Sequence, residues 1–271
     1  MKTGHASIES RRHSATSQAL QVSLTHNTIE MQEAQRLRYK VFVEALGAQL
    51  GTHLGTQLGA HPPRKTPQHE SDMFDAFCDH LIVRDTGSGK VIGTTRLLPP
   101  DAAHRVGCYC AENQFNLTRL LHLRSRMVEV GRLCVHPKYR NRGVIALLWS
   151  ALIEYMRHRG HDTLIGCAPI SMIDGGHNAA NLYLQLGEAQ QAPPEYRAFA
   201  YHGLPCEHLA NAAKPTVPAQ FKAFLRAGAW ICGEPAWNPD DNSADFLMLL
   251  PTNRISSHYL RPTTTNTHKV A

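Results

Sequence analysis

The stretch that decides the fold is Met127-Val-Glu-Val-Gly-Arg-Leu-Cys-Val-His-Pro-Lys-Tyr-Arg-Asn-Arg-Gly143-Val-Ile-Ala-Leu-Leu148. Its first nine residues are rich in β-branched and apolar side chains and predict a strand, and apolar side chains recur at helical spacing after Gly143. The loop Arg140-Asn-Arg-Gly143 therefore ends at the N-terminus of a helix. Backbone N–H groups, the helix dipole and guanidinium groups all favour an anion there. The stretch predicts a strand–loop–helix unit that binds a phosphate or pyrophosphate.

The segments around this unit predict the rest of a sheet. Two β-rich runs, 80–84 and 90–98, flank the turn Asp85-Thr-Gly-Ser-Gly89 and predict a hairpin. Residues 163–169 predict a strand parallel to 127–135, because a helix connects the two. We expect further helices over 28–46, 179–186 and 218–228, and the last two strands over 229–232 and 244–250. This order predicts a single α/β domain with a mixed, mostly antiparallel central sheet flanked by helices.

The composition is that of a folded protein with polar ends. Of 271 residues, 42% are hydrophobic and 18% are charged, which excludes a wholly disordered or collagen-like chain. We expect a flexible polar tail over 1–26, a domain over 27–260 and a flexible C-terminal tail over 261–271. The Leu- and Gly-rich near-repeat of 46–69 is expected to be a low-complexity loop insertion, and 171–215 an irregular insertion.

Simple features exclude several other classes of protein. The longest uncharged apolar run, 143–153, is far shorter than the roughly 20 residues of a membrane-spanning helix. The N-terminus lacks the apolar core of a secretory signal, and the odd number of cysteines, 7, predicts reduced thiols. We therefore expect a cytoplasmic location. No metal is expected, because neither the cysteines nor the 17 histidines have the spacing of a metal site.

The positive charge is concentrated in one segment. The net charge is +6, and the residues from Arg119 to Arg142 contain seven Lys and Arg side chains against the single acid Glu129. Such a segment is either a solvated face or a surface for an anionic partner.

Several motifs, taken together, resemble one enzyme superfamily. The loop Arg140-Asn-Arg-Gly-Val-Ile145 resembles the phosphopantetheine loop of the GNAT acyltransferases, except that Ile145 replaces a Gly or Ala. Arg36-Leu-Arg-Tyr-Lys-Val-Phe42, Asp72-x-x-Asp75 and Val91-Ile-Gly-Thr-Thr-Arg-Leu97 resemble acyl-homoserine-lactone synthases and long-chain N-acyl amino acid synthases. Within that group, the sequence is similar to the bacterial L-ornithine N-alpha-acyltransferases at Glu129-Val-Gly-Arg-Leu-Cys-Val-His-Pro137, Leu148-Trp149, Gly166-Cys-Ala168 and Gly233-Glu-Pro-Ala-Trp237. The resemblance covers about residues 28–260 and implies a single GNAT-like acyltransferase domain.

The resemblance implies a reaction and its partners. The enzyme would transfer a long 3-hydroxyacyl group from acyl carrier protein to the α-amine of L-ornithine and form lyso-ornithine lipid. The acyl-phosphopantetheine of the carrier would be a co-substrate, with no tightly bound cofactor and no nucleic acid partner. The lipid product implies peripheral contact with the inner face of the membrane. The alternatives are a different acceptor amino acid, lactone closure, or a basic GNAT-like module that binds nucleic acid without catalysis.

The chemistry of amide formation singles out Glu129. The attacking amine must be neutral, so a carboxylate is a sensible base, directly or through a water. The alternative for Glu129 is a salt bridge to a basic neighbour. We expect Glu129 and Arg132 to be the catalytic residues, although three positions apart on a regular strand they would face opposite ways. Gly131 permits a bulge there, and the resemblance implies that the strand splays from its neighbour.

The remaining candidate residues form three groups. For Cys134, we expect core packing rather than an acyl-enzyme role, because its apolar setting raises the pKa of a thiol. The resemblance implies that acyl-phosphopantetheine contacts Leu133, Val135, Arg140, Asn141, Arg142, Gly143 and Val144. It also implies an ionic cluster, at or near the acceptor, of Arg38, Asp72, Asp75 and Arg96. Docking of the acidic carrier is expected at Arg124, Arg126 and Lys138.

Overall fold

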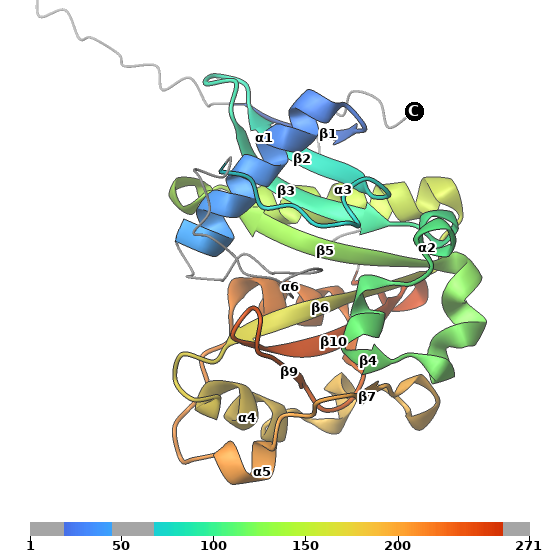
Figure 1. Cartoon of the computed structure of the whole chain (residues 1–271), viewed down its shortest axis with the longest axis vertical. Coiled ribbons are helices and arrows are strands. Elements are labelled where there is room, and N and C mark those ends of the chain that lie inside the picture. Colours follow the sequence, from blue (N-terminus) through green and yellow to red (C-terminus); the bar gives the residue numbers. More distant parts are fainter. Residues whose placement is uncertain (1–18, 45–67, 257–271) are drawn as a thin grey trace, which may run out of the picture.

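A mixed sheet forms the centre of the molecule, for which a computed structural model describes residues 19–44 and 68–256 (Figure 1). The eight-stranded sheet has the order β1-β2-β3-β5-β6-β10-β8, with β9 paired to β10. Its strands are β1 (Leu20–Thr25), β2 (Asp79–Asp85), β3 (Val91–Leu98), β5 (Met127–Val135), β6 (Thr163–Ser171), β8 (Trp230–Ile231), β9 (Ala236–Asn238) and β10 (Ser243–Pro251). Two short strands, β4 (Phe115–Asn116) and β7 (Phe199–Ala200), pair separately.

Only one strand ladder among the described residues is parallel. β5 and β6 run in the same direction, whereas each other ladder between strands is antiparallel. The α-helix that follows β5 makes the crossover that a parallel pair requires. The predicted mixed, mostly antiparallel sheet is thereby confirmed.

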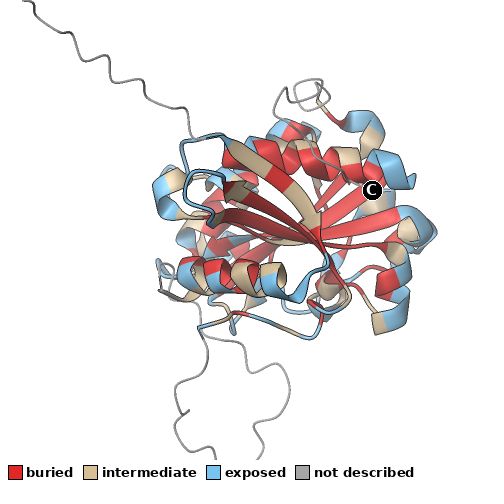
Figure 2. Cartoon of the chain, turned by 90° about the horizontal axis from the view of Figure 1, so that it is seen from above, coloured by how far each residue is buried: buried red, intermediate tan, exposed pale blue. Residues whose placement is uncertain are grey.

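Helices cover both faces of this sheet (Figure 2). The helix α1 packs on β3 and β5, α3 packs on β1, β2 and β3, and α6 packs on β6 and β10. Their bounds, with those of the shorter helices, are α1 (Thr28–Arg38), α2 (Pro100–Val106), α3 (Val144–Arg159), α4 (His177–Leu184), α5 (Cys206–Leu209) and α6 (Ala219–Ala227).

Local sequence explains where the central helix begins and ends. Gly143 precedes α3 with a φ of 74°, and Gly160 follows it with a φ of 70°, a backbone conformation that costs glycine little. Between them, Leu148, Trp149 and Leu152 are fully or almost fully buried, and Trp149 meets Phe224 of α6 edge-on at 5.0 Å. The helix α3 therefore contributes to the main hydrophobic core, where it contacts α6.

Most predicted elements are confirmed; α2, β4 and β9 were not predicted, and three predictions differ from the structure. Residues 20–25, expected within a flexible tail, form the edge strand β1, which pairs with β2 because Val22 is buried beside Val83. The helix expected over 28–46 ends at Arg38 and continues as a π-helix over Tyr39–Glu44. The segment 171–215 is less irregular than expected, since it contains β7 and α5 in addition to α4, the helix predicted over 179–186. The predictions for residues 1–18, 46–67 and 261–271 lie outside the described residues.

Candidate active site

The site is built where β5 and β6 separate (Figure 1). These strands pair over three positions only, the last being Glu129 opposite Ile165. Beyond it β5 continues beside β3, while β6 continues beside β10. Just past the last pair, a Cβ on Gly166 would lie 2.5 Å from the carbonyl oxygen of Val130, so only glycine permits this close approach. The splay that the resemblance implied is present.

A bulge on β5 separates the two candidate catalytic residues. The register between β3 and β5 shifts near Thr94 and Arg96, and Arg132 has a φ of 52°, which is uncommon for a residue other than glycine. The Arg132 guanidinium reaches Glu70 at 3.2 Å and Asp72 at 3.5 Å. The predicted bulge is confirmed, and it directs Arg132 into the ionic cluster.

Glu129 is a buried carboxylate held by the backbone. Its two oxygens accept hydrogen bonds from the N–H groups of Cys110 at 2.6 Å and Ala111 at 2.8 Å. It forms no salt bridge with a residue that the structure describes. Burial raises its pKa to about 7, against the opposing effect of the two N–H groups. The carboxyl group therefore exchanges between its two protonation states near neutral pH.

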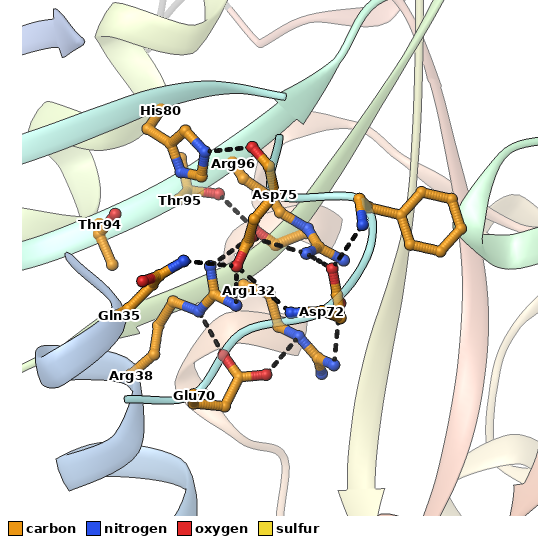
Figure 3. Close-up of polar contacts among 12 residues, drawn as sticks. Gln35, Arg38, Glu70, Asp72, Asp75, His80, Thr94, Thr95, Arg96 and Arg132 are labelled. Atoms are coloured by element: carbon orange, nitrogen blue, oxygen red, sulfur yellow. Dashed lines mark hydrogen bonds and ion pairs between the residues drawn. The ribbon is translucent and has the colours of Figure 1, made fainter. Parts of the chain in front are cut away.

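The expected ionic cluster is present and larger than predicted (Figure 3). The Asp75 carboxylate accepts hydrogen bonds from both terminal nitrogens of Arg38, at 2.7 and 3.0 Å, and from Arg96 at 2.9 Å. Burial opposes the charged form of Asp75, but the two arginines outweigh it and hold its pKa well below the ordinary value. Arg96 also pairs with Asp72, and Arg38 with Glu70.

This cluster connects four parts of the chain. Its members come from α1, from β3, from β5 and from the segment that precedes β2. They include Gln35, whose side-chain amide donates a hydrogen bond to Asp75 at 3.0 Å. Arg38 and Arg96 are almost fully buried, so their partners compensate charges that water cannot reach. Arg132, with a quarter of its side chain exposed, is more accessible than either.

The loop predicted to bind phosphate follows β5. Arg140, Asn141, Arg142 and Gly143 are exposed, and they lead into the N-terminus of α3. Val144 is completely buried, and one of its methyl groups packs against Gly93, in the space that a Cβ there would need. A bound group can therefore meet the backbone of Val144 but not its side chain. The side chains of Leu133 and Val135 are buried in the same core.

The three expected docking residues lie in different surroundings. Arg124 pairs with Glu112 at 2.6 Å and stacks over the Tyr109 ring, and Arg126 pairs with Asp162 at 3.1 Å. Lys138 is exposed in the 3-10 turn Pro137–Tyr139. The structure does not bring Arg124 and Arg126 together with Lys138 by any described contact.

Cys134 is buried with its pKa raised to about 12 by burial, as expected for a packed thiol.

Sequence reasoning missed two parts of the site. The N–H groups of Cys110 and Ala111 belong to backbone, for which no side-chain motif exists. Glu70 stands at the border of the low-complexity segment, two residues before Asp72, and that acidic spacing was the available signal.

Among the described residues, no group of three or more metal-ligating side chains is arranged to hold a metal ion. None of the described helices is long and apolar enough to span a membrane.

The chain is similar in sequence to known acyltransferases. Residues 37–150 match the family described as Acetyltransferase (GNAT) domain. The chain is 31% identical over 257 residues to an L-ornithine N(alpha)-acyltransferase of Rhizobium meliloti (strain 1021), covering 89% of this chain and 83% of that protein. It is 30% identical to the protein of the same name from Rhodobacter capsulatus, covering 88% of this chain and 92% of that one. Among solved structures, the acyl-homoserine-lactone synthase LasI is 14% identical, with a TM-score of 0.45 and coverage of 86% of this chain and 89% of that one.

Proposed function

This chain belongs to the L-ornithine N(alpha)-acyltransferase family, and from that premise we propose that it transfers a long 3-hydroxyacyl group from acyl carrier protein to the α-amine of L-ornithine. The family membership confirms the prediction of an acyltransferase and removes the alternative of a non-catalytic binding module. The product, a lyso-ornithine lipid, is amphipathic. We include peripheral contact with the inner face of the membrane in the same proposal.

The observation that supports the catalytic proposal most is the state of Glu129. Its pKa of about 7 allows the charged form to accept a proton from the α-amine, directly or through a water. The neutral nitrogen then attacks the thioester carbon, the C–N bond forms, and the C–S bond breaks. After the attack the nitrogen loses a second proton, which passes to the released pantetheine thiolate, and the first proton leaves Glu129 for solvent, so that the reaction balances.

The other residues divide between binding and support. Arg132 lies near Asp72 of the ionic cluster and retains an exposed part, so we assign it contact with the acceptor carboxylate. The exposed loop Arg140–Gly143 and the start of α3 would hold the phosphodiester of the pantetheine arm. Arg38, Asp72, Asp75 and Arg96 would keep Arg132 in place.

The test combines purified protein with a chemical readout. Wild-type protein is incubated with 3-hydroxyacyl carrier protein and ornithine, and the acylated product is measured by mass spectrometry. Lysine and arginine replace ornithine in parallel reactions, and 3-hydroxyacyl-CoA replaces the carrier thioester. Acylated ornithine from the carrier thioester is the expected product, and Glu129→Gln should form much less of it at neutral pH. Preference for another amino acid would disprove the acceptor, and preference for the CoA thioester would disprove the donor.

A further inference from the structure

Three lysines from separate elements lie around the start of the phosphate loop. Lys40 is in the π-helix after α1, Lys90 directly precedes β3, and Lys138 is in the turn after β5; all three are exposed. The segments that carry them are packed together through one small apolar cluster, which consists of Leu37, Val41 and Cys134 with Phe42 and Val91. This packing brings the three segments that carry the lysines close together.

His136 lies among these lysines and reports their proximity. The backbone N–H of His136 donates a hydrogen bond to the carbonyl of Ile92 at 2.8 Å, and its ring Nδ1 accepts one from the backbone N–H of Lys138 at 3.3 Å. Partial burial lowers the pKa of His136, and the positive charges of Lys40, Lys138 and Lys90 lower it further. All three ammonium groups are therefore close enough to His136 to affect it.

The charge of this surface is not compensated within the described structure. None of the three lysines forms an ion pair with a described side chain. Arg124 and Arg126 differ, because each faces a carboxylate that reduces its field. An uncompensated group of like charges attracts an oppositely charged partner and accelerates its association.

We propose that Lys40, Lys90 and Lys138, hereafter the lysine surface, dock the acidic acyl carrier protein that delivers the acyl group. The inference rests on the proposed function and adds the place at which the carrier binds. The surface adjoins the loop Arg140–Gly143, at the end of β5 where the strands have separated, so a docked carrier presents its pantetheine arm toward Glu129. Its charges come from three elements and suit a broad anionic face rather than one phosphate group.

A direct binding measurement tests the lysine surface without requiring catalysis. Lys40→Glu, Lys90→Glu and Lys138→Glu are combined in one variant. The control combines Lys214→Glu, Lys222→Glu and Arg226→Glu, which change three exposed residues by the same charge on and before α6. Circular dichroism melting verifies that both variants fold. Binding of fluorescein-labelled bacterial holo-acyl carrier protein is measured by fluorescence anisotropy at low and high salt, and binding to vesicles containing phosphatidylglycerol is measured by sedimentation.

The two variants are expected to differ clearly in their affinity for the carrier protein. The lysine variant should weaken carrier binding by about tenfold or more at low salt, and the difference should shrink as salt screens the charges. The apparent KM for acyl carrier protein should rise in parallel, whereas the KM for ornithine should not. Carrier binding that is lost in the lysine variant supports the surface even if the acceptor is not ornithine, so failure of the proposed function remains distinguishable.

Three results would overturn the inference. Equal weakening in both variants would show that net charge alone attracts the carrier. Unchanged carrier binding in the lysine variant would exclude the surface as a docking site. Loss of vesicle binding with carrier binding retained would assign the surface to an anionic membrane instead.

Discussion

The phenol of Tyr139 donates a 2.7 Å hydrogen bond to the buried carboxylate of Asp85, which is 54 residues earlier in the chain. This bond ties the turn after β5 to the hairpin turn between β2 and β3, where Asp85 also accepts from the N–H of Gly87 at 3.0 Å. The Arg142 guanidinium lies over the Tyr139 ring, 5.1 Å from its centre. The tyrosine therefore fixes the conformation of the proposed phosphate loop from outside it.

Replacing Tyr139 by Phe should weaken donor binding without changing acceptor binding. The change keeps the ring but removes a hydrogen bond of about 1 kcal/mol, so the KM for the acyl donor should rise about fivefold. The KM for ornithine should stay constant. In the control Tyr201→Phe, whose side chain is exposed, neither KM should change. A rise in both KM values for Tyr139→Phe would indicate general damage to the site rather than a positioned loop.

The rate should follow the ionisation of Glu129. Since burial raises the pKa of Glu129 to about 7, its carboxyl is protonated below that pH and cannot accept a proton. We expect the kcat/KM for ornithine to fall about tenfold per pH unit below pH 7. Glu129→Gln should lose about a hundredfold or more of the neutral-pH rate and recover part of it in alkaline solution, where the free amine is neutral. A variant with the wild-type pH profile would remove Glu129 from the mechanism.

Asp75→Asn should destabilise the fold strongly. It leaves the buried guanidinium groups of Arg38 and Arg96 without their shared carboxylate, and breaking such a buried pair costs about 3 to 5 kcal/mol. Urea unfolding measures this, and the control Asp101→Asn, in an exposed pair with Arg105, should cost less than about 1 kcal/mol.

The same carboxylate makes stability depend on pH in a defined direction. The folded pKa of Asp75 is depressed, so its contribution is complete above the unfolded pKa and is lost as the pH falls toward the folded pKa. If Asp75→Asn unfolded like wild type but raised the KM for ornithine, the cluster would be an acceptor site and not a support.

Cys134→Ala should remain active. Direct attack of the amine needs no enzyme nucleophile, and burial raises the pKa of the Cys134 thiol to about 12, so little thiolate is present. We expect a loss of stability of about 1 kcal/mol from the removed packing, measured by thermal unfolding. Intact-protein mass spectrometry during turnover should show no acyl adduct, and an adduct on Cys134 would contradict direct transfer.

The apolar pattern and the glycine positions were sufficient to predict the strand–loop–helix unit of β5 and α3. The apolar and β-branched content of Met127–Val135, and the helix bounded by Gly143 and Gly160, are properties of short continuous segments, and the structure contains both the strand and the helix. The edge strand β1 was not found because its six residues follow a polar segment and derive their burial from β2. Its formation depends on tertiary contacts, which a local pattern does not contain.

The site was predictable in its side chains but not in its backbone. Arg38, Asp72, Asp75 and Arg96 are brought together as the motifs indicated, since their charges are carried by recognisable residues. The N–H donors to Glu129 come from residues 110 and 111, in a segment with no motif. Whether Arg124 and Arg126 would be neutralised depended on Glu112 and Asp162, whose proximity follows only from the fold.

The three-position ladder between β5 and β6 has a consequence for where a substrate can enter. Glu129 occupies the last paired position, so every residue before it lies in closed sheet and every residue after it borders separated strands. With Glu129 in its proposed role, we expect the thioester to approach the carboxylate from the side on which the two strands have separated, because the paired side leaves no gap between them.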